Sequence, residues 1–254
     1  MPEAFSGVPG VALSAVEREP IDLANMRMAY AASGGIGRRG SGDQAAGADG
    51  VKDNLDPIWL AGDPPWLELF GKWLHEAVDA SIPEPNAMVL GTIDAAGHPS
   101  TRTVLCKGVD AGGVTFFTSY ESDKGRHLDA VPHAAVTFPW IAMERQVHFR
   151  GPVTKVPAEQ TADYWTKRPR GSQLSAFASE QSAPIESRGA LEDKAAAVEA
   201  RFGGEQQVPV PAHWGGYVIE PVEVEFWQGR ANRLHNRVRC TLVDARWAVT
   251  RLQP

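Results

Sequence analysis

Five short β-rich runs between residues 87 and 156 constrain the fold more than any other feature of this chain. Turn sequences such as DAAGH (residues 94–98) and DAGG (residues 110–113) separate the runs, which are rich in β-branched and aromatic residues. Connections this short join neighbouring strands that run in opposite directions. The pattern therefore predicts an antiparallel sheet, with strands at 87–93, 100–107, 113–119, 134–140 and 145–156.

Helical patterns lie on both sides of these strands. Asp63 and Pro64 have the character of an N-cap and a first-turn proline, and apolar residues then recur at helical spacing at Leu67, Phe70, Leu74 and Val78. Two more helices are predicted at 158–168 and 190–202, followed by strands at 217–227, 235–243 and 245–252. The fold class predicted is mainly β with helices: an antiparallel barrel decorated by helices.

The first 55 residues differ from the rest of the chain. Residues 31–50 are rich in Gly and Ala and hold almost no large apolar residue, which is typical of a flexible linker. We therefore expect a flexible N-terminal segment at 1–55 and one folded domain at 56–254. Gly35, Gly37 and Gly40 match the GxGxxG dinucleotide pattern, but no strand is predicted before them and no helix after them, so a nucleotide site is disfavoured.

Charge and cysteine content exclude several classes of protein. A net charge of −6 argues against a broad surface for nucleic acid or for an anionic membrane. No apolar stretch is long enough to span a bilayer, and no leader-like segment opens the chain. Cys106 and Cys240 form no CxxC pair and have no metal-ligand neighbourhood, which predicts a cytoplasmic protein without a metal site.

Positive charge is nevertheless concentrated locally. Strand alternation in 100–107 predicts that Arg102 and Lys107 lie on opposite faces, as in an ordinary surface strand. In RPRGSQ (168–173), two arginines and Ser172 flank a glycine, which suits either a phosphate site or a plain surface turn.

The segment RLHNR (233–237) is the densest cluster. If it is extended, Arg233, His235 and Arg237 share one face, where they repel one another unless an anion or an electron-rich ring meets them. The alternative is a solvated edge strand whose charges block aggregation.

A series of motifs, in order and spacing, carries a family resemblance. From about Asp63 to the C-terminus the chain resembles the pyridoxamine 5'-phosphate oxidase family. The resemblance implies a split antiparallel β-barrel of the FMN-binding type, active as a homodimer with FMN between the subunits. It also implies oxidation of pyridoxine or pyridoxamine 5'-phosphate to pyridoxal 5'-phosphate, with O2 as acceptor and H2O2 as product. The motifs are TRTVLCK, FFTSYESDKG, ERQV, YWTKRPRGSQ, EQS, WGGY, EFWQG, RLHNR and RLQP.

The resemblance also implies roles for individual residues. Arg233 and His235 are the expected catalytic residues. The expected substrate contacts are Lys107, Tyr164, Arg168, Ser172, Arg233 and His235, with Arg27 and Tyr30 closing over the site. The expected FMN contacts are Arg102, Thr103, Val104, Leu105, Lys107, Phe117, Thr118, Lys124, Gln146, Gln181, Ser182, Trp227 and Arg237. Arginine and lysine suit the two phosphates, and donors near the flavin suit the negative charge that it gains on reduction.

Three positions depart from the family pattern. Asp123 stands where a basic residue often precedes the FMN-binding lysine, and it puts a negative charge beside the expected phosphate. Phe117 lacks the usual tyrosine hydroxyl, and Asn236 replaces a carboxylate.

Two other functions suit the same barrel: a reductase with another flavin-like cofactor, and a protein that holds flavin or pyridoxal phosphate without turnover. The cation and imidazole of Arg233 and His235 favour the oxidase over both.

Overall fold

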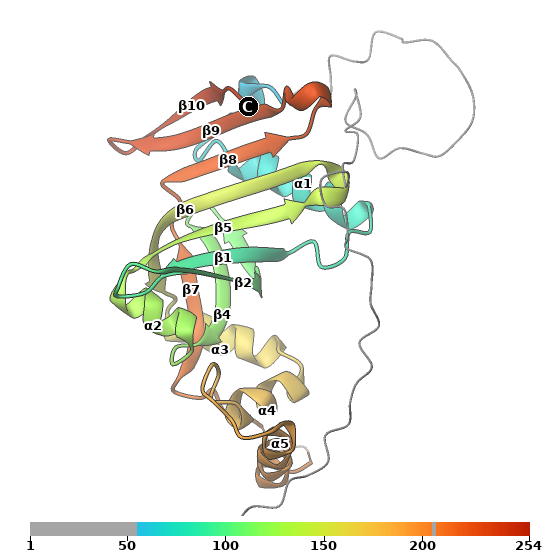
Figure 1. The fold of residues 1–254 in the computed structure, drawn as a ribbon, viewed down its shortest axis with the longest axis vertical. Helices are drawn as coiled ribbons and strands as arrows, with labels where there is room; N and C mark the ends of the chain where they lie inside the picture. The colour runs from blue at the N-terminus through green and yellow to red at the C-terminus, as the bar shows by residue number, and fades with distance from the viewer. Residues whose placement is uncertain (1–54, 205–206) are drawn as a thin grey trace, which may run out of the picture.

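A computed structural model describes residues 55–204 and 207–254 of the chain (Figure 1). The expected lid residues Arg27 and Tyr30, the Gly-rich linker and the GxGxxG pattern all lie outside the described residues. The expectations for residues 1–54 therefore stay predictions.

The described part of the chain folds around one ten-stranded antiparallel sheet. Its main path runs β10-β9-β8-β6-β5-β1-β2, while β3, β4 and β7 form a branch that joins it through β6. This confirms the mainly antiparallel β fold predicted from the spacing of the runs. The strands are β1 (Ala87–Ile93), β2 (Pro99–Leu105), β3 (Gly108–Asp110), β4 (Gly113–Ser119), β5 (His133–Trp140), β6 (Arg145–Lys155), β7 (Trp214–Ile219), β8 (Glu223–Gln228), β9 (Asn236–Val243) and β10 (Arg246–Leu252).

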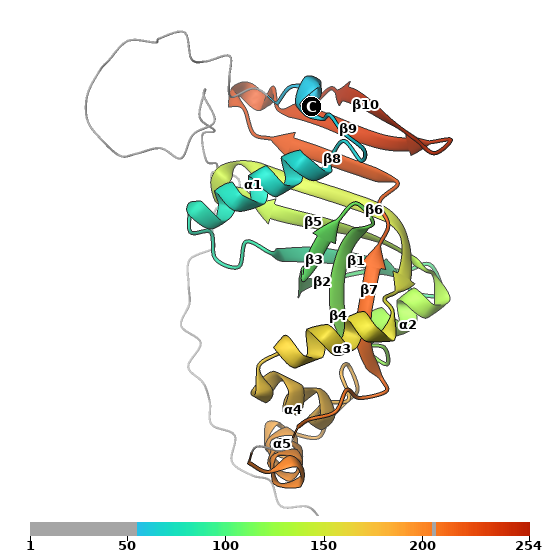
Figure 2. The same cartoon turned by 180° about the vertical axis from the view of Figure 1, so that it is seen from behind.

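Strand β6 curls the sheet into a half-barrel because it pairs with different neighbours along its length. Residues 145–150 pair with β8 on one side, and residues 145–152 pair with β5 on the other. Its last three residues, 153–155, pair instead with β7. The branch of β7, β4 and β3 thereby turns across the main sheet, as Figures 1 and 2 show. This arrangement agrees with the expected split barrel.

An aromatic core fills the concave side of the sheet, against helix α1 (Leu67–Asp79), which Figure 2 shows in front. The ring of Phe70 on α1 lies 4.9 Å from that of Phe138 and 5.1 Å from that of Phe149, centroid to centroid. The helix begins at Leu67, later than the expected start at Asp63. Val78, expected on the apolar face, is 55% exposed, so that expectation was wrong. The buried face is Leu69, Phe70, Trp73 and Ala77.

The other helices cover the end of the half-barrel near β4 and β7. They are α2 (Asp123–Ala130), α3 (Ala158–Lys167), α4 (Arg170–Ala178) and α5 (Arg188–Phe202). A second apolar cluster joins α3, α4 and α5 to the sheet. It is made by Trp165, Leu174, Phe202, Val208 and Trp214. The segment 168–173 is not a plain surface turn, since α4 begins within it.

Single turns of 3-10 helix complete the described elements, at Pro57–Trp59, Ile141–Met143 and Ala231–Arg233. The long run predicted at 217–227 is divided into β7 and β8 around Pro221, which has no N–H to give to a ladder.

Candidate active site

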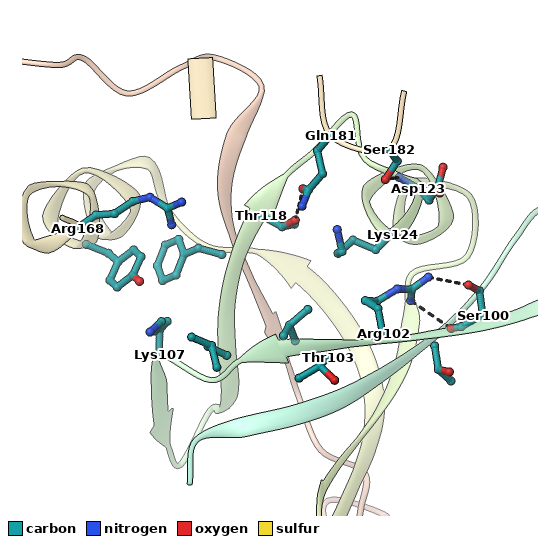
Figure 3. A pocket seen from close by; sticks show the side chains of 15 residues that line it. Ser100, Arg102, Thr103, Lys107, Thr118, Asp123, Lys124, Arg168, Gln181 and Ser182 are labelled. Carbon is teal, nitrogen blue, oxygen red and sulfur yellow. Dashed lines mark hydrogen bonds between the residues drawn. The ribbon is translucent and has the colours of Figure 1, made fainter. Parts of the chain in front are cut away.

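A cavity of about 560 Å³ opens between β2, β4, α2, α3 and the segment that follows α4 (Figure 3). Twelve of the residues expected to bind FMN or substrate line it: Arg102, Thr103, Val104, Leu105, Lys107, Phe117, Thr118, Lys124, Tyr164, Arg168, Gln181 and Ser182. Residues distant in the sequence therefore meet around one space, as the motif series implied.

Strand β2 lines the cavity along its length, because it is the last strand on its side of the sheet. Its free edge gives residues of both strand faces access to the cavity. Arg102 and Lys107, predicted on opposite faces of an ordinary surface strand, therefore both line the cavity. Lys107 lies just beyond the end of β2, where its N–H donates to the carbonyl of Thr115 at 2.8 Å.

Arg102 is a half-buried cation at the cavity wall. Its Nη2 donates to Ser100 Oγ at 3.0 Å, and its Nη1 donates to Thr92 Oγ1 at 2.6 Å and to the Ser100 carbonyl at 3.1 Å. Desolvation by burial lowers the pKa of Arg102, and the carboxylate of Asp123 partly opposes this effect. Its contacts are neutral oxygens, so its charge remains available to an anion.

Lys124, in the first turn of α2, is a second cation in the same region, as Figure 3 shows. It is only 7% exposed, and its Nζ donates to Ser122 Oγ at 3.2 Å. Burial, and then repulsion from Arg102, lower the pKa of Lys124 to about 8. A buried ammonium beside a guanidinium is unfavourable unless an anion joins them.

Asp123 compensates this charge only in part. Its carboxylate forms an exposed ion pair with Arg126, one turn along α2. Its backbone N–H donates to Ser182 Oγ at 3.2 Å, while Thr118 donates to Gln181 Oε1 at 3.0 Å. The segment carrying Gln181 and Ser182 is thereby tied across the cavity, to β4 and to the start of α2.

Stacked aromatic rings form the opposite wall. Phe117 lies 4.0 Å from Tyr164 and 5.5 Å from Trp214, centroid to centroid, with nearly parallel planes. The guanidinium of Arg168 lies over the Trp214 ring at 5.1 Å, and its Nε donates to the carbonyl of Ser172 at 3.0 Å. Burial lowers the pKa of Arg168, although Tyr164 opposes the shift. Ser172 supports Arg168 through its backbone and does not itself line the cavity.

Three expected FMN contacts lie elsewhere, in one row across the sheet. Gln146 on β6 is opposite Trp227 on β8, which is opposite Arg237 on β9. The His235 ring lies 4.7 Å from that of Trp227. None of these four residues lines the cavity. The expected site is thus divided into two groups within one chain.

The structure corrects the expectation for the segment RLHNR. Arg233 ends a 3-10 turn and has a φ of 61°, so it is not extended beside His235 and Arg237. Strand β9 begins at Asn236 and is covered on its outer side by β10, so it is not an edge strand. Arg237 donates from Nε to Glu225 Oε1 at 2.7 Å, and this pair relieves the predicted repulsion.

Sequence comparisons identify the family. The family model described as pyridoxamine 5'-phosphate oxidase matches residues 74–202, and the one described as the pyridoxine 5'-phosphate oxidase C-terminal dimerisation region matches residues 214–254. The chain is 54% identical to the pyridoxine/pyridoxamine 5'-phosphate oxidase of Rhodococcus jostii, over 92% of this chain and 99% of that protein. The chain belongs to the pyridoxamine 5'-phosphate oxidase family.

Further comparisons are consistent with this family assignment. The corresponding protein of Mycolicibacterium gilvum is 56% identical, over 91% of this chain and 97% of that protein. The structure of PhzG from Burkholderia lata, in complex with tetrahydrophenazine-1-carboxylic acid, has a TM-score of 0.72 at 30% identity and covers 80% of this chain and 98% of that one. An FMN-binding, oxidase-related protein of Nostoc punctiforme has a TM-score of 0.63 at 18% identity, covers 76% of this chain and 100% of that one, and supports the fold alone.

The contacts expected from the family resemblance did not include every residue of the cavity. Ser100, Thr101 and Asp123 also line it, and Ser122 and Trp214 hold its cations in place. Strand alternation could have found Ser100, which shares a face with Arg102.

A separate finding concerns membranes: the helices in the described part of the chain are all too short or too polar to span a bilayer.

Proposed function

We propose that the protein is an FMN-dependent oxidase that converts pyridoxine 5'-phosphate or pyridoxamine 5'-phosphate to pyridoxal 5'-phosphate. When bound, FMN would supply the redox chemistry: a hydride acceptor for the substrate carbon that carries the alcohol or amine, and reoxidation by O2 with release of H2O2. The amine substrate would in addition consume one water and release ammonia. The compartment we propose is the cytoplasm, since Cys106 and Cys240 are buried free thiols.

The observation that carries the proposal is the pair of cations Arg102 and Lys124. Both line the cavity, and the pKa of each is lowered by burial. A phosphate dianion would stabilise the ammonium form of Lys124, which burial disfavours. It would also accept charge-assisted hydrogen bonds from both side chains. The residues present therefore fit the phosphate of FMN. Unpaired edge groups of β2 would supply neutral donors and acceptors to the rest of the cofactor.

The substrate phosphate fits the other end of the cavity. Figure 3 shows Lys107 and Arg168 on the side away from Arg102 and Lys124. The Tyr164 hydroxyl would add a neutral donor. Two separate pairs of cations suit two phosphates, one on the cofactor and one on the substrate.

The divided site supports a homodimer with FMN sites at the subunit interface. We infer that Gln146, Trp227 and Arg237 of one subunit complete the cavity of the other, together with Arg233 and His235. This explains why these residues lie outside the cavity of their own chain. The match of residues 214–254 to a dimerisation region is consistent with that assembly. His235, with a pKa lowered by burial and by Arg233, would be neutral at pH 7. Its Nδ1 accepts from the backbone N–H of Arg230 at 3.1 Å, so its hydrogen would be on Nε2, from which it could donate to a ligand.

The test is spectroscopic. Purified protein loaded with FMN is expected to lose its flavin absorbance when pyridoxine 5'-phosphate is added without air, and to recover it with formation of H2O2 when air is admitted. Flavin that binds but is not reduced would favour the non-catalytic holder, and a protein that binds no FMN would end the proposal.

A further inference from the structure

A part-buried hydrogen-bond chain connects Arg102 to residues that do not line the cavity. Arg102 Nη1 donates to Thr92 Oγ1 at 2.6 Å, and Thr92 Oγ1 lies 3.0 Å from Nδ1 of His127. Thr92 is on β1 and is only 1% exposed, while His127 is in the last turn of α2. Neither residue lines the cavity, and neither belongs to the motifs that carried the family resemblance.

Chemistry fixes the direction of one of these hydrogen bonds. A guanidinium can only donate, so the oxygen of Thr92 accepts from Arg102. The hydroxyl of Thr92 keeps its hydrogen and a second lone pair, so it can donate to Nδ1 of His127 or accept from it, and either bond holds the hydroxyl in place behind Arg102.

We propose that Thr92 and His127 are positioning residues, which orient Arg102 toward the phosphate of the cofactor. With Nη1 held from behind by Thr92 and by the carbonyls of Leu90 and Ser100, the guanidinium plane is fixed. In the part of the chain that the structure describes, no partner hydrogen-bonds Nε of Arg102. Nε and one N–H of Nη2 are therefore left for an anion. This inference rests on the proposed function.

Preorganisation is the physical reason for such a chain. An arginine on the free edge strand β2 has several rotatable bonds, and ordering them when the ligand binds would weaken binding. Buried hydrogen bonds made in advance remove that cost. The competing interpretation is that the Thr92–His127 contact only ties α2 to β1. In that case its loss would lower the stability of the protein without a specific effect on the binding of a phosphate.

The experiment compares FMN with riboflavin, which has the same ring system and no phosphate. Thr92→Val changes the side-chain volume very little. The dissociation constant of FMN is expected to rise about tenfold in this variant, because one hydrogen bond to Arg102 is lost. The constant for riboflavin is expected to stay unchanged, because riboflavin has no group for Arg102 to bind. Thr92→Ser keeps the hydroxyl and should restore the affinity for FMN.

Two further variants separate positioning from folding. Thr154→Val is the control for the substitution itself: it removes an exposed hydroxyl that donates to Glu220 at 2.9 Å, and Thr154 does not line the cavity. It should leave both dissociation constants unchanged. In an Arg102→Ala background, Thr92→Val and His127→Leu should have no further effect on FMN, since they act through Arg102.

The possible results have distinct meanings. Equal weakening of FMN and riboflavin in Thr92→Val, or additivity with Arg102→Ala, would overturn the inference and leave a tie between α2 and β1. FMN affinity unchanged in Thr92→Val would overturn it as well. A wild-type protein that binds neither FMN nor riboflavin would instead refute the proposed function.

Discussion

Among single residues, Lys124 is the one expected to make FMN affinity depend on pH. Its pKa is lowered to about 8, so its ammonium is present below pH 8 and is lost as the pH rises above that value. A phosphate dianion binds the charged form, so FMN affinity should be highest below pH 8 and should fall above it, by up to about tenfold per pH unit. Titration of FMN fluorescence between pH 7 and 10 measures this dependence.

The matched variant for this measurement is Lys124→Arg. An arginine keeps its charge over the whole range, so the fall in affinity above pH 8 should disappear. A pH profile that Lys124→Arg does not change would show that another group controls binding.

Arg168 should determine selectivity for the substrate phosphate. We expect Arg168→Ala to raise KM for pyridoxine 5'-phosphate far more than it lowers kcat, because the phosphate is remote from the reacting carbon and is bound similarly throughout the reaction. In the wild type, unphosphorylated pyridoxine should react at least about 10³-fold less efficiently, because donors built for a phosphate would be left unpaired. Steady-state H2O2 production with both substrates tests this. Comparable rates for the two substrates would contradict the assignment of this end of the cavity to the substrate phosphate.

At the scale of elements, the entry into α2 allows no side chain at Gly125. A Cβ added there would lie 2.0 Å from the carbonyl oxygen of Tyr120, so the turn that places Lys124 would have to move. Gly125→Ala should therefore lower the free energy of unfolding by about 1–3 kcal/mol, the usual range for overpacking. The same substitution should also weaken FMN binding, because it moves the turn that carries Lys124.

Gly71 in α1 is the control for this substitution. Nothing lies within 4 Å of a Cβ added there, so Gly71→Ala should stabilise the protein by about 0.5–1 kcal/mol through helix propensity. Chemical denaturation of the two variants gives both values. Equal stability of the two would mean that the turn before α2 tolerates a side chain.

Elements with a clear apolar period could be predicted from the sequence. The bounds of β1 and β4 agree with the predicted runs, because each run is bounded by turn residues. Helix α2 was missed, since DKGRHLDA holds a glycine and Leu128 is its only large apolar residue. Helix α4 was missed because its arginine and glycine start resembles a turn. The buried face of α1 was misjudged: of the four residues expected on it only Phe70 is buried, and the other three buried residues are Leu69, Trp73 and Ala77.

At the scale of the whole molecule, the divided site predicts complementation between two defective variants. Arg102→Ala damages the cavity, and Trp227→Ala damages the row on the sheet. In a mixed dimer one site carries both defects and the other carries neither. Co-expression should therefore restore about a quarter of wild-type activity, since about half of randomly paired dimers are mixed and each has one intact site of two.

The complementation experiment has a matched negative control. Arg102→Ala paired with Lys124→Ala places both changes in the same cavity, so every mixed dimer has two defective sites. Co-expression of that pair should restore no activity. If Arg102→Ala and Trp227→Ala also fail to complement, the site is contained within one chain.

The site could be predicted from the sequence only through its family motifs. Local patterns could not show that Lys107 and Arg168 share a cavity, because strand alternation predicts the face of a residue and not which distant elements lie beside it. Local patterns also could not find Thr92, whose hydroxyl meets His127 only because α2 returns to β1. Such contacts join segments far apart in the sequence, which residue periodicity does not record.

The pairing of β4 with β7 has a consequence for the time at which the site forms. Besides the short β3, β4 has β7 as its strand partner, with Phe117 opposite Gly216, about a hundred residues later in the chain. During synthesis from the N-terminus, the wall that carries Phe117 and Thr118 has no support until nearly the whole chain has left the ribosome. Contacts this distant in sequence form slowly. A nascent chain thus has Arg102 and Lys124 long before it has the cavity that they line.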